Sequence, residues 1–216
     1  MATVVVLAKA PVPGQVKTRL CPPCTPVEAS AIAEAALMDT LDAVSRCKAT
    51  RRVIALDGQR GSWLDAAAAE FDVIAQRGGG LDVRLADAFD DVLAGSGEPC
   101  VLIAMDTPHV RPADLDNAID ALARASAVLG LAEDGGFWLV GLRKASRASF
   151  VGVPMSTPTT GVDQLHRLRS VHGKVAVLET MRDVDDVADL EWLSANHPTL
   201  RTAAVWQRQR GGETGL

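Results

Sequence analysis

The residues best suited to bind a phosphorylated ligand lie near the N-terminus. Lys17, Thr18 and Arg19 follow a loop that contains two prolines and one glycine. Two cations, together with backbone amides at the entry to a helix, can hold a polyphosphate and stabilise a leaving phosphate group. The loop matches neither the P-loop nor the Rossmann glycine motif. These residues alone therefore leave a solvated loop with incidental cations as an equal alternative.

Carboxylates that could bind a metal ion occur at two later points. Asp106 directly follows the apolar run 100–105, and Pro108 then ends the strand. Mg²⁺ needs only one or two protein carboxylates in addition to substrate phosphates, although an Asx turn is the alternative at Asp106. Asp183 and Asp185 alternate in an extended segment, so both could face one ion. Acidic residues at 185 or 186 could equally cap the helix that follows.

Residues 133–138 (EDGGFW) combine an acidic pair with two glycines between apolar runs. The segment is typical of a hairpin turn. In a functional interpretation, Asp134 takes part in catalysis, and Gly135 and Gly136 allow the protein backbone to approach a ligand closely. Phe137 or Trp138 would then form an apolar wall, although Trp138 could equally belong to the core.

Cys21 and Cys24 form a CxxC pair, which could be a thiol redox site. The order of strands and helices around it does not match a thioredoxin fold, and we expect free thiols. The four histidines are scattered without the spacing of zinc ligands.

The elements that must position these residues follow from hydrophobic periodicity. Short β-branched or apolar runs predict strands at 4–8, 52–56, 71–75, 100–105, 128–131, 137–142 and 175–178. Capping residues and helical periodicity predict helices at 25–44, 62–70, 81–93, 112–125, 160–170 and 186–195. This alternation indicates an α/β fold with a mostly parallel sheet, whose carboxyl edge would carry the ligand loops. We predict one domain over residues 1–205 and a flexible tail over 206–216.

Composition excludes several functional classes. The formal charge of −5 disfavours a nucleic-acid or membrane-surface binder. No apolar run approaches the ~20 residues of a membrane span. These features favour a cytoplasmic enzyme and leave a homodimer open.

The chain resembles the bacterial DUF2064 proteins, described as a glycosyltransferase family within the nucleotide-diphospho-sugar transferase (GT-A) superfamily. The matching segments are LAKAPVPGQVKTRL, IAMDTP, VLGLAEDGGFWLVGL and DVDDVADL, over about residues 4–190. The resemblance implies a three-layer, Rossmann-like GT-A fold, with nucleotide bound across its first half and acceptor across the second. It also implies Mg²⁺ (or Mn²⁺) at Asp106 and nucleotide phosphates near Lys17 and Arg19.

A more distant similarity is to the phospholactate guanylyltransferases, which share the KTRL loop and the DVD segment. That similarity suggests Asp183 and Asp185 as ligands of the metal or of an acceptor phosphate. The chain departs from the family in QRGGGLDVRL, with Gly80 and Asp82 at unusual positions, and in Met155, where tryptophan is usual.

We therefore predict a Mg²⁺-dependent transferase with a nucleotide-activated donor and a small-molecule acceptor. Glycosyl transfer from a nucleotide-diphospho-sugar is favoured. The alternatives are a nucleotidyltransferase that joins an NTP to a phosphorylated acceptor, and a non-catalytic nucleotide-binding module. Lys17, Asp106 and Asp134 are the predicted catalytic residues, and Gly135, Gly136 and Phe137 would bind the acceptor. The predicted nucleotide- or phosphate-binding residues are Ala8, Lys9, Lys17, Thr18, Arg19, Gln76 and Arg84.

Overall fold

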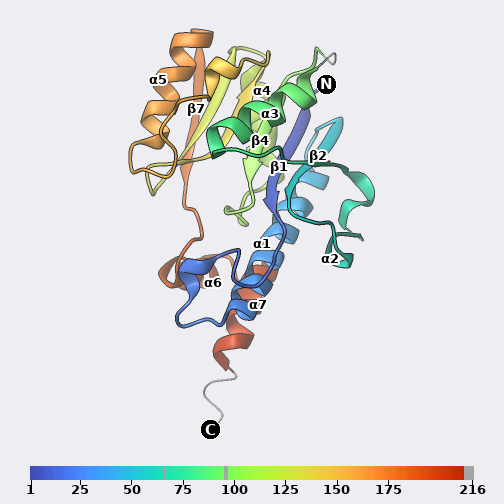
Figure 1. The fold of residues 1–216 in the computed structure, drawn as a ribbon, viewed down its shortest axis with the longest axis vertical. Helices are drawn as coiled ribbons and strands as arrows, with labels where there is room; N and C mark the ends of the chain where they lie inside the picture. Colours follow the sequence, from blue (N-terminus) through green and yellow to red (C-terminus); the bar gives the residue numbers. More distant parts are fainter. Residues whose placement is uncertain (66, 95–96, 212–216) are drawn as a thin grey trace.

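One seven-stranded sheet forms the centre of the computed structural model, which describes residues 1–65, 67–94 and 97–211 (Figure 1). The strand order is β3-β2-β1-β4-β6-β5-β7. The strands are β1 (Thr3–Lys9), β2 (Arg51–Asp57), β3 (Asp72–Ala75), β4 (Cys100–Ala104), β5 (Ala127–Ala132), β6 (Phe137–Leu142) and β7 (Val175–Met181). Each predicted strand is present, which confirms the α/β architecture.

The sheet is parallel except at β6, which runs antiparallel to both β4 and β5. The predicted mostly parallel sheet is therefore confirmed, as is the hairpin between β5 and β6. In the register of the central pair, Leu7 of β1 lies beside Ala104 of β4. The loops that leave these two strands consequently start side by side at the carboxyl edge of the sheet.

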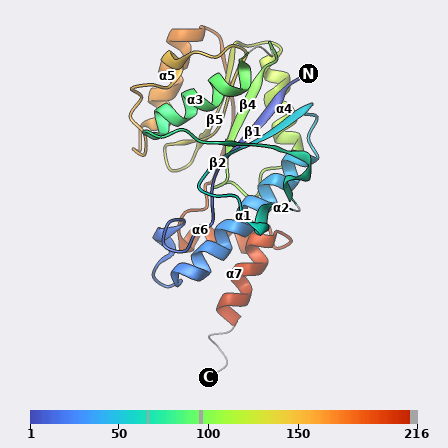
Figure 2. The ribbon, with the colours of Figure 1, turned by 45° about the vertical axis from the view of Figure 1, so that its right-hand side comes forward.

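Helices cover both faces of the sheet and give the three expected layers (Figure 2). On one face, α1 (Pro26–Ser45) and α4 (Pro112–Leu122) pack on alternate residues of β1 such as Val4 and Val6. On the other face, α3 (Leu81–Leu93) and α5 (Thr160–His172) pack in the cluster that contains Val5. The predicted capping box of α1 is present, with Glu28 Oε2 accepting from the backbone N–H of Thr25 at 2.7 Å.

A third hydrophobic cluster joins the C-terminal helices to the start of α1. Helices α6 (Val187–Asn196) and α7 (Arg201–Gly211) lie beside the N-terminal half of α1 and the turn at Thr18–Leu20 (Figure 1). Leu20, Ile32, Leu193 and Trp206 are buried together there. The short helix α2 (Ser62–Asp65) and the 3₁₀ turns Ala67–Glu70 and Arg147–Ser149 complete the described elements.

Residues 206–211, which the sequence places in a flexible tail, continue α7 in the structure. The reason is Trp206, whose side chain is only 4% exposed within the third cluster. One large apolar residue in a polar segment gave too weak a periodic signal to predict this helix. Residues 212–216 lie outside the described part of the chain. None of the helices in the described residues has the length and apolar character needed to cross a bilayer.

Candidate functional site

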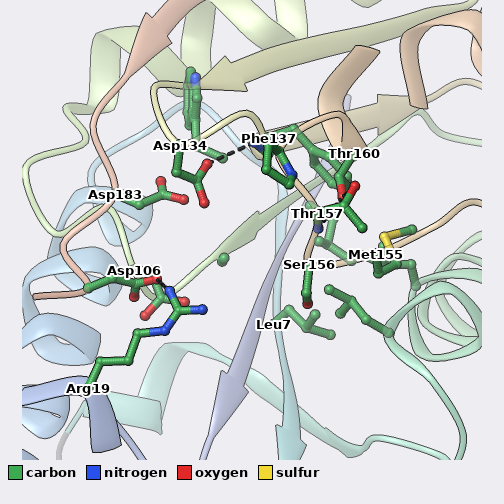
Figure 3. Close-up of a pocket in the computed structure, with 18 residues that line it drawn as sticks. Leu7, Arg19, Asp106, Asp134, Phe137, Met155, Ser156, Thr157, Thr160 and Asp183 are labelled. Atoms are coloured by element: carbon green, nitrogen blue, oxygen red, sulfur yellow. Dashed lines mark hydrogen bonds and ion pairs between the residues drawn. The ribbon is translucent and has the colours of Figure 1, made fainter. Parts of the chain in front are cut away.

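Four aspartates from three loops line one cavity of about 400 Å³ at the carboxyl edge of the sheet. Asp106 follows β4, Asp134 lies in the β5–β6 hairpin, and Asp183 and Asp185 follow β7. Figure 3 shows Asp183 between Asp134 and Asp106. A backbone hydrogen bond from Val184 N–H to the carbonyl of Asp106, at 2.8 Å, joins two of these loops. The structure thus brings together acidic residues that are far apart in the sequence.

Lys17 lies within this acidic cluster, and its side chain is only 6% exposed. Its ammonium donates to the Asp106 carboxylate, to the backbone carbonyl of Val184 and, at 3.0 Å, to Asp185 Oδ1. Burial alone would lower the pKa of Lys17, but the charges of Asp106 and Asp185 outweigh it and raise that pKa. Lys17 therefore remains a cation, and its left-handed backbone (φ +46°) turns the chain toward the carboxylates.

Arg19 is the second cation of the loop that we predict to bind phosphate, and it is far more accessible. Its side chain is 73% exposed, and its Nη1 pairs with Asp185 Oδ2 at 3.1 Å. The loop also borders a second cavity of about 260 Å³, whose lining includes Lys9, Thr18 and Asp106. All three predicted phosphate-binding residues at 17–19 therefore line the second cavity, and Arg19 lines the main cavity as well.

Asp183 has a carboxylate oxygen that no described residue stabilises by a hydrogen bond. Its Oδ1 is buried and has no hydrogen-bond partner among the described residues. Burial, together with the neighbouring charges of Asp134, Asp106 and Asp185, raises the pKa of Asp183 to about 8, although Lys17 opposes this effect. An orphaned buried carboxylate oxygen of this kind indicates a ligand that supplies positive charge or a proton.

The donor set fits a divalent ion that obtains part of its coordination from a ligand. In the described residues, no three or more acidic, histidine or cysteine side chains form a ready-made metal cage. Asp106 and Asp185 are nevertheless accessible, with side chains 38% and 37% exposed, and Asp183 carries an unpaired oxygen. Mg²⁺ and Mn²⁺ prefer such oxygens, and Mg²⁺ commonly uses one or two carboxylates plus phosphates.

The hairpin glycines contact the protein's own backbone. Gly135 has φ +91°, and a Cβ atom there would come within 2.0 Å of the Pro158 carbonyl oxygen. The N–H of Gly161 also donates to the Gly135 carbonyl at 2.7 Å. Because Asp134 Oδ1 accepts from the N–H of Gly136 at 2.8 Å, this tight turn also orients Asp134. Close approach at Gly135 thus packs the hairpin against the start of α5.

The opposite wall of the main cavity is apolar and hydroxyl-bearing. Phe137 and Trp138 both line it, although Trp138 is only 2% exposed and donates from Nε1 to the carbonyl of Glu179 at 3.1 Å. Ser156 also lines the cavity, with a left-handed backbone (φ +59°) (Figure 3). The sequence analysis missed this residue because residues 156–159 (STPT) have no periodicity that would mark a site. The other residues of this wall include Leu7, Leu81, Leu85, Leu102, Met155 and Thr157.

Two predicted nucleotide-binding side chains have structural partners and line neither of these two cavities. Gln76 donates from Nε2 to the carbonyls of Ala8 and Ala55, at 2.8 and 2.9 Å, and so braces adjacent strand ends. Arg84 pairs with Asp57 at 2.8 Å. Their nucleotide contacts, and that of Ala8, stay predictions.

Asp189 holds the segment that carries Asp183 and Asp185. Its Oδ2 accepts from the N–H groups of Asp185 and Asp186 at 2.9 and 3.0 Å, and its Oδ1 accepts from Arg182 Nε at 2.7 Å. Asp186 is the N-cap of α6. The capping function that we considered for 185 or 186 therefore belongs to Asp186, which leaves the Asp185 carboxylate to the ion pairs with Lys17 and Arg19.

Behind Asp106, the loop at His109 packs on α6. The His109 ring lies 5.2 Å from Trp192 and 5.0 Å from His197, between ring centroids, and its Nδ1 is buried without a partner among the described residues. Burial, together with the charges of His197 and Arg111, lowers the pKa of His109 to about 4, and Asp114 opposes this effect.

No disulfide joins Cys21 to Cys24 in the described structure.

The fold is that of the nucleotide-diphospho-sugar transferases and related nucleotidyltransferases. A similar solved structure is a provisionally assigned nucleotide-diphospho-sugar transferase from Desulfovibrio desulfuricans G20. The two share 24% identity over 97% of this chain and 95% of the other, with a TM-score of 0.86. The chain belongs to the DUF2064 family, described as uncharacterised proteins conserved in bacteria, whose model matches residues 40–157.

Two more distant structures share the fold and were solved with bound ligands. CMP:2-keto-3-deoxy-manno-octonic acid synthetase in complex with CTP has 14% identity and a TM-score of 0.56, over 90% of this chain and 97% of the other. Glucosyl-3-phosphoglycerate synthase from Mycobacterium tuberculosis, with Mn²⁺, UDP and glucosyl-3-phosphoglycerate, has 14% identity and a TM-score of 0.53, over 90% and 75%. No curated protein matches the chain.

Proposed function

We propose that this protein is a divalent-cation-dependent transferase that moves a glycosyl group from a nucleotide-diphospho-sugar to a neutral, hydroxyl-bearing acceptor. The observation that carries the proposal is the charge distribution of the main cavity. Its lining contains Asp106, Asp134, Asp183 and Asp185, and Arg19 is the one cation among the described lining residues. Lys17, buried beside Asp106, supplies the second positive charge of the site.

The two cations suffice for one diphosphate. Lys17 and Arg19 lie in one loop, at the end of the cavity that also holds Asp106. A phosphorylated acceptor would need further cations on the side of Asp134, where the described wall is acidic, apolar or hydroxyl-bearing. Because like charges in a site of low dielectric repel strongly, that side favours a neutral acceptor.

The chemistry assigns a separate task to each group. Lys17 and Arg19 would hold the phosphate oxygens and offset the charge on the departing nucleoside diphosphate. Asp106, Asp183 and Asp185 would hold a divalent ion, which as a Lewis acid supplies further stabilisation of that leaving group. Asp134, oriented by the Gly136 N–H, would accept the proton of the acceptor hydroxyl. The hydroxyl oxygen bonds to the anomeric carbon as the bond from that carbon to the phosphate oxygen breaks.

Nucleotidyl transfer is the second candidate. Its support is the shared fold with a synthetase that binds CTP, together with the pairing of Lys17 and Asp106 beside a phosphate-sized cavity. In this reaction an acceptor phosphate oxygen would attack the α-phosphorus of an NTP, and pyrophosphate would leave. A non-catalytic binding module has weaker support. Asp82, one of the residues at which the chain departs from the family, accepts from the Gly152 N–H at 2.9 Å and does not line the main cavity, so this departure does not change the cavity lining.

The decisive experiment incubates the protein and Mn²⁺ with a panel of nucleotide-diphospho-sugars and a panel of NTPs, with neutral and phosphorylated acceptors. Release of a nucleoside diphosphate with a neutral acceptor is the expected result. Release of pyrophosphate that depends on a phosphorylated acceptor would establish the second candidate instead. If isothermal titration detects donor binding but no acceptor supports turnover, the protein is a non-catalytic binding module.

Variants assign the result to this site. Asp106→Ala should abolish turnover and weaken donor binding, whereas Asp134→Asn should lower kcat with little change in donor affinity. Asp42→Asn is the matched control, since Asp42 pairs with Arg46 on an exposed part of α1. Equal activity of Asp106→Ala and Asp42→Asn would refute the assignment of the site.

A further inference from the structure

Lys17 contacts one oxygen of each of two carboxylates that a divalent ion would use. Its ammonium contacts the carboxylates of Asp106 and Asp185, and it also takes the carbonyl of Val184, which lies between Asp183 and Asp185 in the sequence. Arg19, the neighbouring cation, reaches only one of these carboxylates and is 73% exposed. Lys17 is therefore the internal counter-ion of the acidic cluster.

An ammonium and a divalent ion compete for these carboxylates. Mg²⁺ binds oxygen at about 2.0–2.1 Å, so an ion held by Asp106 and Asp185 would lie close to the Lys17 ammonium. Two cations this close repel, and a carboxylate oxygen that solvates one is withdrawn from the other. Binding of the ion is thus strengthened when the ammonium moves off the carboxylates.

Lys17 can leave only toward a new anionic partner. Its side chain is 6% exposed, and a buried ammonium without a partner is costly. The cavity of about 260 Å³ adjoins Lys17, and its lining includes Lys9, Thr18 and Arg19. Phosphate oxygens in that cavity would receive the Lys17 ammonium as the metal ion takes its place on Asp106 and Asp185.

We propose that Lys17 couples the two ligands of the site, so that a divalent ion and a diphosphate each strengthen the binding of the other. This inference rests on the proposed function, because it assigns the coupling between the metal ion and the donor diphosphate in that site to the Lys17 side chain. Coupling of this kind is reciprocal, and a factor of roughly ten or more in affinity is typical. Its consequence is that the ion binds weakly until the donor arrives.

Equilibrium dialysis with Mn²⁺ alone and with Mn²⁺ plus pyrophosphate tests the inference without turnover. The complex of Mn²⁺ with pyrophosphate equilibrates across the membrane, so the excess on the protein side reports binding. In the wild type, pyrophosphate should raise the affinity for Mn²⁺ at matched free ion by about tenfold or more. Lys17→Met should bind Mn²⁺ alone about tenfold more tightly, because it removes a unit charge near the ion. Its coupling to pyrophosphate should be largely lost.

Arg19→Met is the matched control, because it removes a cation from the same loop that contacts Asp185 but leaves Asp106 untouched. It should weaken pyrophosphate binding and retain the coupling. Independent binding of the two ligands by the wild type would overturn the inference, as would full coupling in Lys17→Met. If Lys17→Met does not fold, Lys17→Gln, which also lacks the positive charge, replaces it in the same comparison. Failure of the wild type to bind either ligand would overturn the proposed function as well, whereas independent binding of both would overturn the inference alone.

Discussion

Replacement of Gly135 by alanine tests whether the hairpin that carries Asp134 depends on contact with α5. Gly135 has φ +91°, and an added Cβ would lie 2.0 Å from the backbone oxygen of Pro158. Ordinary contact begins at 3.4 Å, so the two backbones would have to separate by about 1.4 Å, the difference between these distances. Because the obstacle is a carbonyl group, no side-chain rotation can relieve the clash.

The magnitude follows from three contributions. A non-glycine residue in the left-handed region costs about 1–2 kcal/mol. Overpacking against fixed neighbours adds about 1–3 kcal/mol. Separation of the backbones also breaks the hydrogen bond from Gly161 to Gly135, which contributes about 1 kcal/mol. We therefore expect Gly135→Ala to lower the free energy of unfolding by roughly 3–6 kcal/mol.

Gly173→Ala isolates the packing contribution. Gly173 also has positive φ (+75°), but an added Cβ there would meet nothing within 4 Å. It should cost only the backbone contribution of about 1–2 kcal/mol. Urea denaturation of both variants measures the difference, and dialysis with Mn²⁺ and pyrophosphate reports whether the metal side of the site survives. Equal losses of stability in the two variants would refute the contact between hairpin and α5.

The remaining predictions concern the scaffold around the site. Asp39→Asn should lower the free energy of unfolding by about 2–3 kcal/mol in urea titrations, because the buried carboxylate accepts from both N–H and Oγ1 of Thr202 at the start of α7; stability equal to the wild type would contradict this. Asp189→Asn should weaken Mn²⁺ binding by roughly tenfold in dialysis, because Asp189 accepts a hydrogen bond from the backbone of Asp185. Unchanged affinity would show that the position of Asp185 does not depend on Asp189. His109 has its pKa lowered from 6.5 to about 4, so the unfolded chain takes up a proton first as pH falls, and stability is lost between pH 6.5 and about 4. This loss should reach at most about 3 kcal/mol and be smaller in His109→Gln, as measured by urea denaturation across that range.

Most of the fold could be predicted because its signals are local. The run Val4–Ala8 is apolar throughout, as expected for a strand buried on both faces, and Thr25 with Glu28 marks the start of α1. Helix α7 could not be predicted in the same way. Its segment ends in the polar run 207–210 (QRQR), and the side chain of Trp206 is buried only because α1 and α6 lie beside it. Tertiary packing, which local periodicity does not contain, decides that helix.

The candidate site could be predicted where a residue suited to the chemistry also follows a buried strand. Lys17 and Asp106 each follow a buried strand, and parallel pairing of β1 with β4 brings their loops together. Two things were not predictable from the residues. Gly135 could have met a ligand or a protein backbone, and only the structure identifies Pro158 as its neighbour. Ser156 lines the cavity because of its left-handed backbone, which its residue type does not favour.

The C-terminal helices belong to the scaffold of the site. Val184 is 2% exposed in the same cluster as Leu20, which closes the phosphate-binding loop, and Trp206 of α7 completes that cluster. Since alternate residues of an extended segment point to opposite sides, burial of Val184 turns Asp183 and Asp185 together toward the cavity. The Val184 backbone meanwhile binds both the Asp106 carbonyl and the Lys17 ammonium. The buried Val184 thus connects the loop that carries Lys17, the loop that carries Asp106, and the segment that carries Asp183 and Asp185. The packing of α6 and α7 around Val184 therefore contributes to the geometry in which Lys17 faces its carboxylates.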